Sequence, residues 1–115
     1  EAAHVQAVRE AAHANDIALL LSFHDFQRTP PVEELVRRFR KAQDLGADVG
    51  KLAVMPRSKA DVLALLQATL EASGTLDIPV AGMFSAGEIA PVQGATFVHG
   101  YSSVFGLIRP RAGRL

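Results

Sequence analysis

The chain has 115 residues, with 12 basic and 12 acidic side chains, a hydrophobic share of 49% and no cysteine. A net charge of zero does not indicate the excess of basic residues that is typical of proteins that bind nucleic acid or an anionic membrane. The lack of cysteine excludes disulfides, thiolate metal sites and thiol nucleophiles. No run approaches the roughly 20 apolar residues of a membrane span, and the opening residues do not resemble a signal peptide. We therefore expect one soluble, cytoplasmic domain over residues 1–115.

The first part of the chain predicts a helix, a strand and a second helix. Apolar residues recur at three- and four-residue steps within 2–15, which indicates a helix. The unbroken apolar run 17–21 indicates a strand that is covered on both faces. Two prolines begin a helix over 30–45, since proline suits the first turn, and Gly46 is expected to end it.

The middle of the chain repeats this order. Residues 49–55 read as a second strand, and Ser58 with Asp61 resembles a capping box at the start of a third helix. Gly74 is expected to break that helix. Residues 78–84 read as a third strand, whose proline lies near its start, where a missing N–H does least harm.

The C-terminal part carries weaker signals. Residues 87–94 predict at most a short helix, interrupted by Pro91, and 102–108 predict a fourth strand. Residues 109–115 are expected to form a loose tail. The alternation of strands and helices, at about 30 residues per unit, predicts an α/β fold in which all four strands are parallel neighbours in chain order.

Two architectures fit this alternation, namely a small open sheet and part of a barrel. The chain is too short for a closed eight-fold α/β barrel, which typically needs about 250 residues. No Gly-rich phosphate loop is present, which disfavours the nucleotide-binding α/β folds.

Two polar residues stand out against the apolar strands. His24 follows the first strand, and Lys51 lies inside the second strand, where period two puts it on the face opposite Leu52. A lysine there is either a strand-start residue that reaches solvent or a desolvated amine that attacks carbonyl groups. The two residues are one α/β unit apart, so they can approach each other across adjacent strands. Together they suggest imine chemistry with histidine as general acid/base.

Other titratable residues are weaker candidates. Asp25 either orients His24 or caps the loop that follows it, and the sequence leaves both open. His4 and His13 lie on the first helix and are expected to face water. His99 has no companion at the spacing of metal ligands, so we predict no metal site.

Two motifs resemble those of a known enzyme family. The first is segment 22–26 (Ser-Phe-His-Asp-Phe), followed by Thr29-Pro30. The second is segment 51–56 (Lys-Leu-Ala-Val-Met-Pro), followed by segment 58–62 (Ser-Lys-Ala-Asp-Val). In residues, order and separation they closely resemble type I 3-dehydroquinate dehydratase, and the similarity extends over about 18–70.

The resemblance implies a fold and an activity. The family is a (β/α)8 TIM barrel that dehydrates 3-dehydroquinate to 3-dehydroshikimate in the shikimate pathway of aromatic amino acid biosynthesis. It uses no metal or cofactor and is usually a homodimer. The chain would be the C-terminal half of that barrel, with strands five to eight. By resemblance Lys51 forms the Schiff base and His24 is the catalytic general acid/base, with a small-molecule substrate and no nucleic acid or membrane partner.

The similarity to the family weakens after Met83. The family has a Ser-Lys-Thr-Gly segment followed by an arginine that holds the substrate carboxylate, and segment 85–91 puts Pro91 at that arginine's position. Proline cannot make a bidentate carboxylate contact. The family's Ser-Ala-Pro-Gly-Gln loop is replaced by the arginine-containing segment 109–114. The substrate-binding residues therefore stay unassigned.

Three functions remain open at this point. The first is a lyase of the dehydratase type, and the retained His24 and Lys51 favour it. The second is a catalytically impaired, dehydratase-derived binding or regulatory module, which Pro91 favours. The third is another Schiff-base lyase of the class I aldolase type, against which the paired motifs argue.

Overall fold

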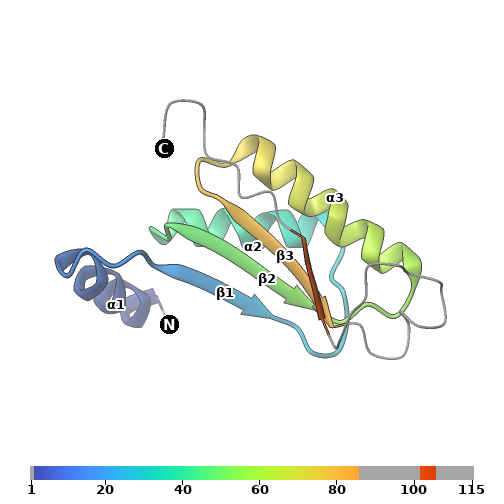
Figure 1. Cartoon of the computed structure of the whole chain (residues 1–115), viewed down its shortest axis with the longest axis horizontal. Coiled ribbons are helices and arrows are strands. Elements are labelled where there is room, and N and C mark those ends of the chain that lie inside the picture. The colour runs from blue at the N-terminus through green and yellow to red at the C-terminus, as the bar shows by residue number, and fades with distance from the viewer. Residues whose placement is uncertain (1, 86–101, 106–115) are drawn as a thin grey trace.

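A computed structural model describes residues 2–85 and 102–105 (Figure 1). Three helices alternate with three strands, and a fourth strand follows. In chain order they are α1 (Ala2–Ala14), β1 (Leu20–His24), α2 (Val32–Asp44), β2 (Val49–Val54), α3 (Lys59–Thr75), β3 (Val80–Ser85) and β4 (Ser102–Phe105). Within this part of the chain, no helix is long and apolar enough to cross a membrane.

The strands form one sheet in the order β1-β2-β3-β4. The first three strands are parallel neighbours, with Leu20 beside Val49 and Gly50 beside Val80. Helices α2 and α3 lie together behind one face of this sheet, while α1 lies beyond the N-terminal end of β1 (Figure 1). The α/β class and the order of the first three strands are therefore as predicted, and one face of the sheet carries no helix among the described elements.

Strand β4 contradicts the prediction of four parallel strands. It pairs antiparallel with β3, so that Gly82 lies opposite Phe105. A parallel pair needs a crossover of a dozen or more residues, usually a helix, whereas an antiparallel pair needs none. Segment 86–101 contains Pro91, which is unfavourable inside a helix, so the sequence gives a helical crossover little support. The short helix predicted at 87–94 and the tail predicted at 109–115 lie outside the described residues.

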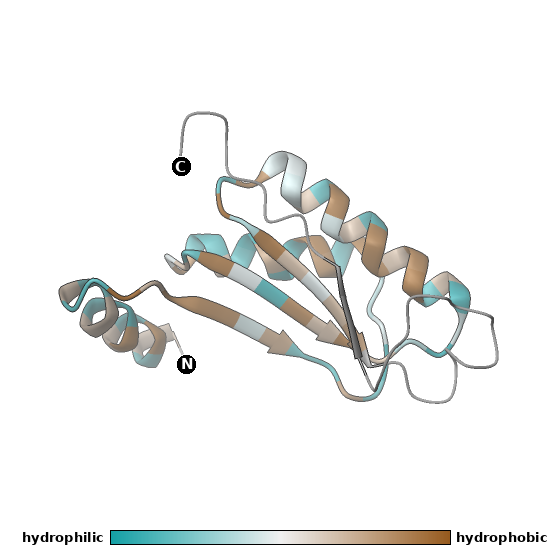
Figure 2. Ribbon diagram, in the orientation of Figure 1, coloured by the Kyte–Doolittle hydropathy of each residue, from teal (hydrophilic) through white to brown (hydrophobic). Residues whose placement is uncertain are grey.

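The hydrophobic core lies between the sheet and the two covering helices. From α2 it takes Leu35 and Phe39, both fully buried, as the apolar stripe of that helix requires. The other members come from the helix-facing side of the strands, from α3 and from the residue that follows α3, namely Leu52, Val54, Leu65, Ala68, Ala72, Leu76, Val80 and Phe84. Figure 2 shows the apolar character of the strands, with a hydrophilic band in the middle of β2.

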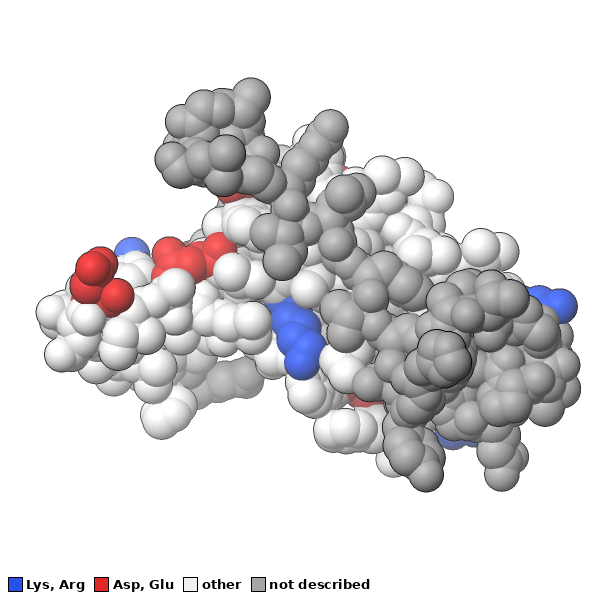
Figure 3. Space-filling view, viewed as in Figure 1, with Lys and Arg blue, Asp and Glu red and all other residues white. Residues whose placement is uncertain are grey.

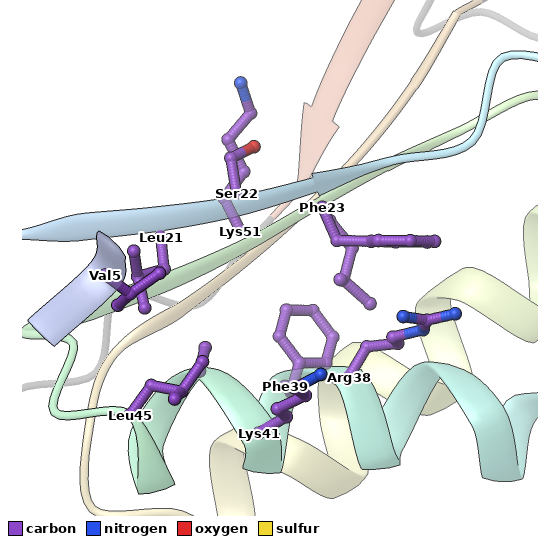
Figure 4. A pocket seen from close by; sticks show the side chains of 11 residues that line it. Val5, Leu21, Ser22, Phe23, Arg38, Phe39, Lys41, Leu45 and Lys51 are labelled. Carbon is purple, nitrogen blue, oxygen red and sulfur yellow. The ribbon is translucent and has the colours of Figure 1, made fainter. Parts of the chain in front are cut away.

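The first strand differs from its prediction in position and in burial. It begins at Leu20 rather than at Ile17, and its residues alternate between exposed and half-buried instead of being covered on both faces. Leu20 is 51% exposed. Its side chain shares the face of Ser22, two residues further along the strand, and Figure 4 shows that face on the side away from α2. The preceding N–H of Leu19 is bonded to the Asp48 carboxylate at 2.7 Å, not to a neighbouring strand.

The helix ends follow the predicted signals closely. Gly46 has φ +87° and follows the last turn of α2, where its N–H bonds to Gln43 and the N–H of Ala47 bonds to Ala42. These two bonds form a Schellman motif. The Ser58 hydroxyl accepts from the N–H of Asp61 at 3.2 Å, which caps α3. Helix α3 runs through the predicted break at Gly74 and ends one residue later.

Candidate active site

Lys51 lies in the middle of β2 and extends from the face of the sheet that α2 and α3 leave open. Its neighbours Gly50 and Leu52 are buried against the helices, while Lys51 is half-buried. Figure 4 shows Lys51 and Ser22 on the side away from α2, and Phe23 on the side toward it. Period two along the strand produces this arrangement, as the sequence predicts.

His24 is the last residue of β1 and not, as predicted, the residue after the strand. It is exposed, and its Nε2 lies 2.7 Å from the Ser22 hydroxyl oxygen. The ring of Phe26 meets the imidazole edge to face, with 5.5 Å between ring centroids. Two contacts therefore hold the imidazole at the carboxyl end of β1.

The strand register brings His24 and Lys51 to the same face of adjacent strands. Ser22 pairs with Lys51, and His24 pairs with Ala53, so the two functional candidates are offset by two residues along the strands. Ser22 lies between them. Figure 3 shows basic atoms near the middle of this side of the molecule and acidic atoms toward the end that holds α1. An amine and an imidazole can thus reach one small molecule placed over the open face.

Asp25 caps the loop after β1, which is one of the two roles left open by the sequence. Its Oδ1 accepts from the N–H groups of Gln27 at 2.9 Å and Arg28 at 3.0 Å. The hydrogen bond from Gln27 is the main reason that the pKa of Asp25 lies below its ordinary value, with the Arg28 backbone and guanidinium adding to it. The carboxylate is therefore engaged by the loop rather than by the imidazole.

The loops at the carboxyl ends of β1 and β2 are joined by hydrogen bonds that the sequence did not suggest. The Thr29 hydroxyl donates to the carbonyl of Met55 at 2.9 Å, and Arg57 Nε donates to the carbonyl of Gln27 at 2.7 Å. The N–H of Asp25 also donates to the carbonyl of Ala53 at 2.9 Å. These bonds fix the two loops that border the open face.

A cavity of about 130 Å³ lies between β1, β2 and α2 (Figure 4). Val5 of α1, Leu21 and Leu45 line it, and the Arg38 guanidinium lies 4.0 Å from the centre of the Phe23 ring. Ser22 and Lys51 also belong to its lining, although their side chains extend to the other side of the sheet in Figure 4. The cavity therefore lies on the helix side of the two strands that carry the candidate residues.

The remaining sequence candidates contribute no ligand cluster within the described ranges. His4 is exposed, and His13, also exposed, bonds to the Asp48 carboxylate at 3.2 Å. The backbone hydrogen bond from Leu19 is the main cause that lowers the pKa of Asp48, and His13 adds to it. No group of three or more metal-ligating side chains lies within residues 2–85 and 102–105. Pro91, His99 and the segment 109–114 lie outside these ranges.

Ser22 is the residue of this site that sequence reasoning overlooked. The available signal was its spacing, since a residue two positions before His24 on a strand shares its face. Thr29 and Arg57 carried no such signal, because their partners are carbonyl groups of distant segments.

Comparison with known proteins identifies the family. The model of the type I 3-dehydroquinase family matches residues 1–97. A 3-dehydroquinate dehydratase of Albidiferax ferrireducens is 53% identical over 83 residues, which are 72% of this chain and 31% of that protein. A 3-dehydroquinate dehydratase of Salmonella paratyphi B is 44% identical over 108 residues, which are 91% of this chain and 42% of that protein.

Solved structures agree with this match. The type I 3-dehydroquinate dehydratase of Clostridium difficile, described with covalent modified comenic acid, is 40% identical at a TM-score of 0.72 and covers 74% of this chain and 34% of its own. The enzyme of Geobacillus kaustophilus is 42% identical at a TM-score of 0.72, covering 77% and 35%. These neighbours are TIM barrels, of which the chain spans only a part. Strand β4 lies beyond the residues matched by the family model. The chain belongs to the type I 3-dehydroquinase family.

Proposed function

We propose that this chain carries the catalytic pair of a 3-dehydroquinate dehydratase. Lys51 forms a Schiff base with the substrate, and His24 acts as general acid/base. The observation that carries the proposal is that His24 and Lys51 share the open face of paired strands, as the strand register and the alternation of β1 require. Both residues also lie within the part of the chain matched by the family model. The covalent modified comenic acid in the Clostridium difficile structure is consistent with a reactive nucleophile in such a barrel.

The first chemical stage joins the amine to the substrate. The neutral amine of Lys51 attacks the C3 ketone of 3-dehydroquinate and forms a carbinolamine. His24 relays protons while the carbinolamine loses its hydroxyl group as water, which leaves a protonated imine. The positive nitrogen withdraws electrons from the neighbouring carbon and so acidifies the hydrogen on C2.

The second stage removes water from the substrate. His24 takes the C2 proton, and the electron pair of that C–H bond forms an enamine. The enamine electrons then expel the C1 hydroxyl, which leaves as water after it receives a proton from His24. Hydrolysis of the remaining imine releases 3-dehydroshikimate and restores Lys51.

The activity is proposed for a complete barrel. The chain spans 31% and 42% of the two curated relatives, so the remaining strands of the barrel must cover the open face. We expect a small-molecule substrate, a cytoplasmic location and a homodimer, as in the family that the sequence resembles.

A second candidate function rests on Pro91. By the resemblance it occupies the position of the arginine that holds the substrate carboxylate, and it cannot make that contact. A chain that keeps the imine-forming residues but lacks this cation would be a catalytically impaired module. It would bind a ketone ligand without turning it over.

Reductive trapping tests both candidates. The chain is co-expressed with the N-terminal part of the Salmonella relative, so that both parts of a barrel are present; we call this assembly the complemented barrel. Sodium borohydride with 3-dehydroquinate should reduce the imine and add one ligand mass to the peptide that contains Lys51. Lys51→Ala should abolish trapping and turnover together.

Lys59→Ala is the matched control, because Lys59 is an exposed lysine at the start of α3. It should leave both trapping and turnover unchanged. Labelling of Lys59, or near-normal turnover in Lys51→Ala, contradicts the assignment. Trapping at Lys51 without turnover selects the impaired module, and Pro91→Arg is then the variant that should restore activity.

A further inference from the structure

We propose that Ser22 is the positioning residue of His24, which holds the imidazole over the site through both proton transfers. The inference rests on the proposed function, because Ser22 would act only through His24. It adds a third residue to the pair that the family motifs suggest.

The geometry of β1 places the hydroxyl where this role requires it. Ser22 and His24 are two residues apart on one strand, so their side chains leave the same face, and 2.7 Å separates Ser22 Oγ from His24 Nε2. Phe26 contacts the imidazole edge to face, with ring planes at 74°. A hydrogen bond and an aromatic contact together limit rotation of the ring.

The position of Ser22 also keeps the imidazole on the same side of the sheet as Lys51. It is the register partner of Lys51 on the adjacent strand, and both side chains extend from the sheet on the side away from α2 (Figure 4). An imidazole held by Ser22 is therefore kept on the lysine side of the carboxyl edge. An imidazole turned outward from β1 would face solvent instead.

No carboxylate described in this chain takes the orienting role. Asp25, the nearest acidic residue in the sequence, accepts from the N–H groups of Gln27 and Arg28. A base is usually oriented by a third group in such constellations. Within the described residues, the Ser22 hydroxyl is the group hydrogen-bonded to His24.

A hydroxyl suits this task chemically because its oxygen accepts from an N–H. The ring nitrogen toward the substrate takes and returns the proton, so Nε2 keeps its hydrogen and donates it to Ser22 Oγ in both the neutral and the protonated imidazole. The contact thus survives when His24 takes the C2 proton and when it gives a proton to the leaving hydroxyl. The ring nitrogen that Ser22 does not hold is the one left to face the substrate.

Kinetics in the complemented barrel test the proposal. Ser22→Ala should lower kcat by about 10- to 100-fold through misplacement of the base, with KM changed less than about 3-fold and borohydride trapping at Lys51 retained. Ser22→Thr keeps the hydroxyl and should recover most of kcat. Ser73→Ala is the matched control, since the Ser73 hydroxyl donates to Leu70 within α3; it should leave kcat unchanged.

Two results overturn the role of Ser22, namely wild-type kcat in Ser22→Ala, and a Ser22→Thr variant no better than Ser22→Ala. Failure of trapping in the unmutated barrel counts against the proposed function instead. A second measurement does not depend on turnover. The imidazole ¹⁵N chemical shifts of His24, recorded by NMR on the complemented barrel with this chain ¹⁵N-labelled, should differ between wild type and Ser22→Ala. Identical shifts would show that the hydroxyl does not hold the ring.

Discussion

Replacement of Gly46 by alanine should destabilise the fold through the turn that leads from α2 into β2. Gly46 has φ +87°, a left-handed conformation that costs an L-residue about 1–2 kcal/mol. A Cβ there would also collide with the guanidinium of Arg9, whose Nε is buried without a hydrogen-bond partner. Alanine also lowers the conformational entropy of the unfolded chain, and this effect offsets about 0.4–1 kcal/mol of the loss in stability. We expect the free energy of unfolding to fall by about 1–3 kcal/mol in total.

Urea unfolding of the complemented barrel, followed by circular dichroism, measures this loss as a lower midpoint at constant m-value. Gly74→Ala is the matched control, because a Cβ at Gly74 meets nothing within 4 Å and the residue lies in α3. The same substitution should there stabilise the protein by about 0.5–1 kcal/mol. The two glycines should therefore shift the midpoint in opposite directions.

A double variant separates the two sources of strain. Arg9→Ala removes the side chain that the new Cβ would contact. In the Arg9→Ala background, Gly46→Ala should therefore lower the free energy of unfolding by less than it does in the wild type, and the difference is the contribution of the collision. The loss that persists in that background is the contribution of the left-handed backbone. A Gly46→Ala protein as stable as wild type at an unchanged m-value would refute both the left-handed turn and the contact with Arg9.

Four further outcomes are expected. His24→Ala should lower turnover of the complemented barrel by roughly 10²- to 10⁴-fold in steady-state assays, while slow trapping at the lysine persists. Phe39 is fully buried, so Phe39→Ala should lower the free energy of unfolding, measured in urea, by about 3–5 kcal/mol. Leu63 is 64% exposed, so Leu63→Ala should change the same free energy by less than about 1 kcal/mol. The pKa of Asp25 is lowered chiefly by the hydrogen bond from Gln27, so the ionised carboxylate stabilises the fold at pH values above 3.8, the ordinary pKa of the group. This stabilisation disappears as pH falls through the lower pKa of the folded state. In urea titrations, the difference in the free energy of unfolding between wild type and Asp25→Asn should therefore close below pH 3.8. The isolated chain should dimerise or aggregate in sedimentation experiments because the outer edge of β1 is unpaired within the described sheet; a monodisperse monomer that melts well above about 45–65 °C would contradict this expectation.

Local rules predicted much of the fold. Period two put Lys51 opposite Leu52, and in the structure Leu52 is buried while Lys51 is half-buried, as alternation along β2 requires. Gly46 and Ser58 marked the ends of two helices because left-handed turns and N-caps demand those residue types. Each of these predictions depends on a few neighbouring residues, which is why the sequence was sufficient.

Features that depend on distant partners were predicted less well. The direction of β4 is decided by pairing with β3 across segment 86–101, and an apolar run such as 102–108 is compatible with either direction. The burial of β1 was overestimated because the apolar run at 17–21 does not show which faces other elements cover. Asp25 was ambiguous for the same reason, since its partners are backbone groups that only the folded loop brings to it.

The open face links the stability of this chain to its chemistry. Leu20 is 51% exposed on β1, and Lys51 is half-buried on the adjacent strand, so the side that exposes apolar surface is also the side that carries the amine. Elements that cover this face remove apolar area from water, at about 25 cal/mol per Å². In the proposed mechanism they would also enclose the imine that Lys51 forms, so borohydride trapping should be much weaker in the isolated chain than in the complemented barrel. Equal trapping in both would mean that Lys51 needs no cover to react, and that the reactivity of the amine is set by groups already present in β1 and β2.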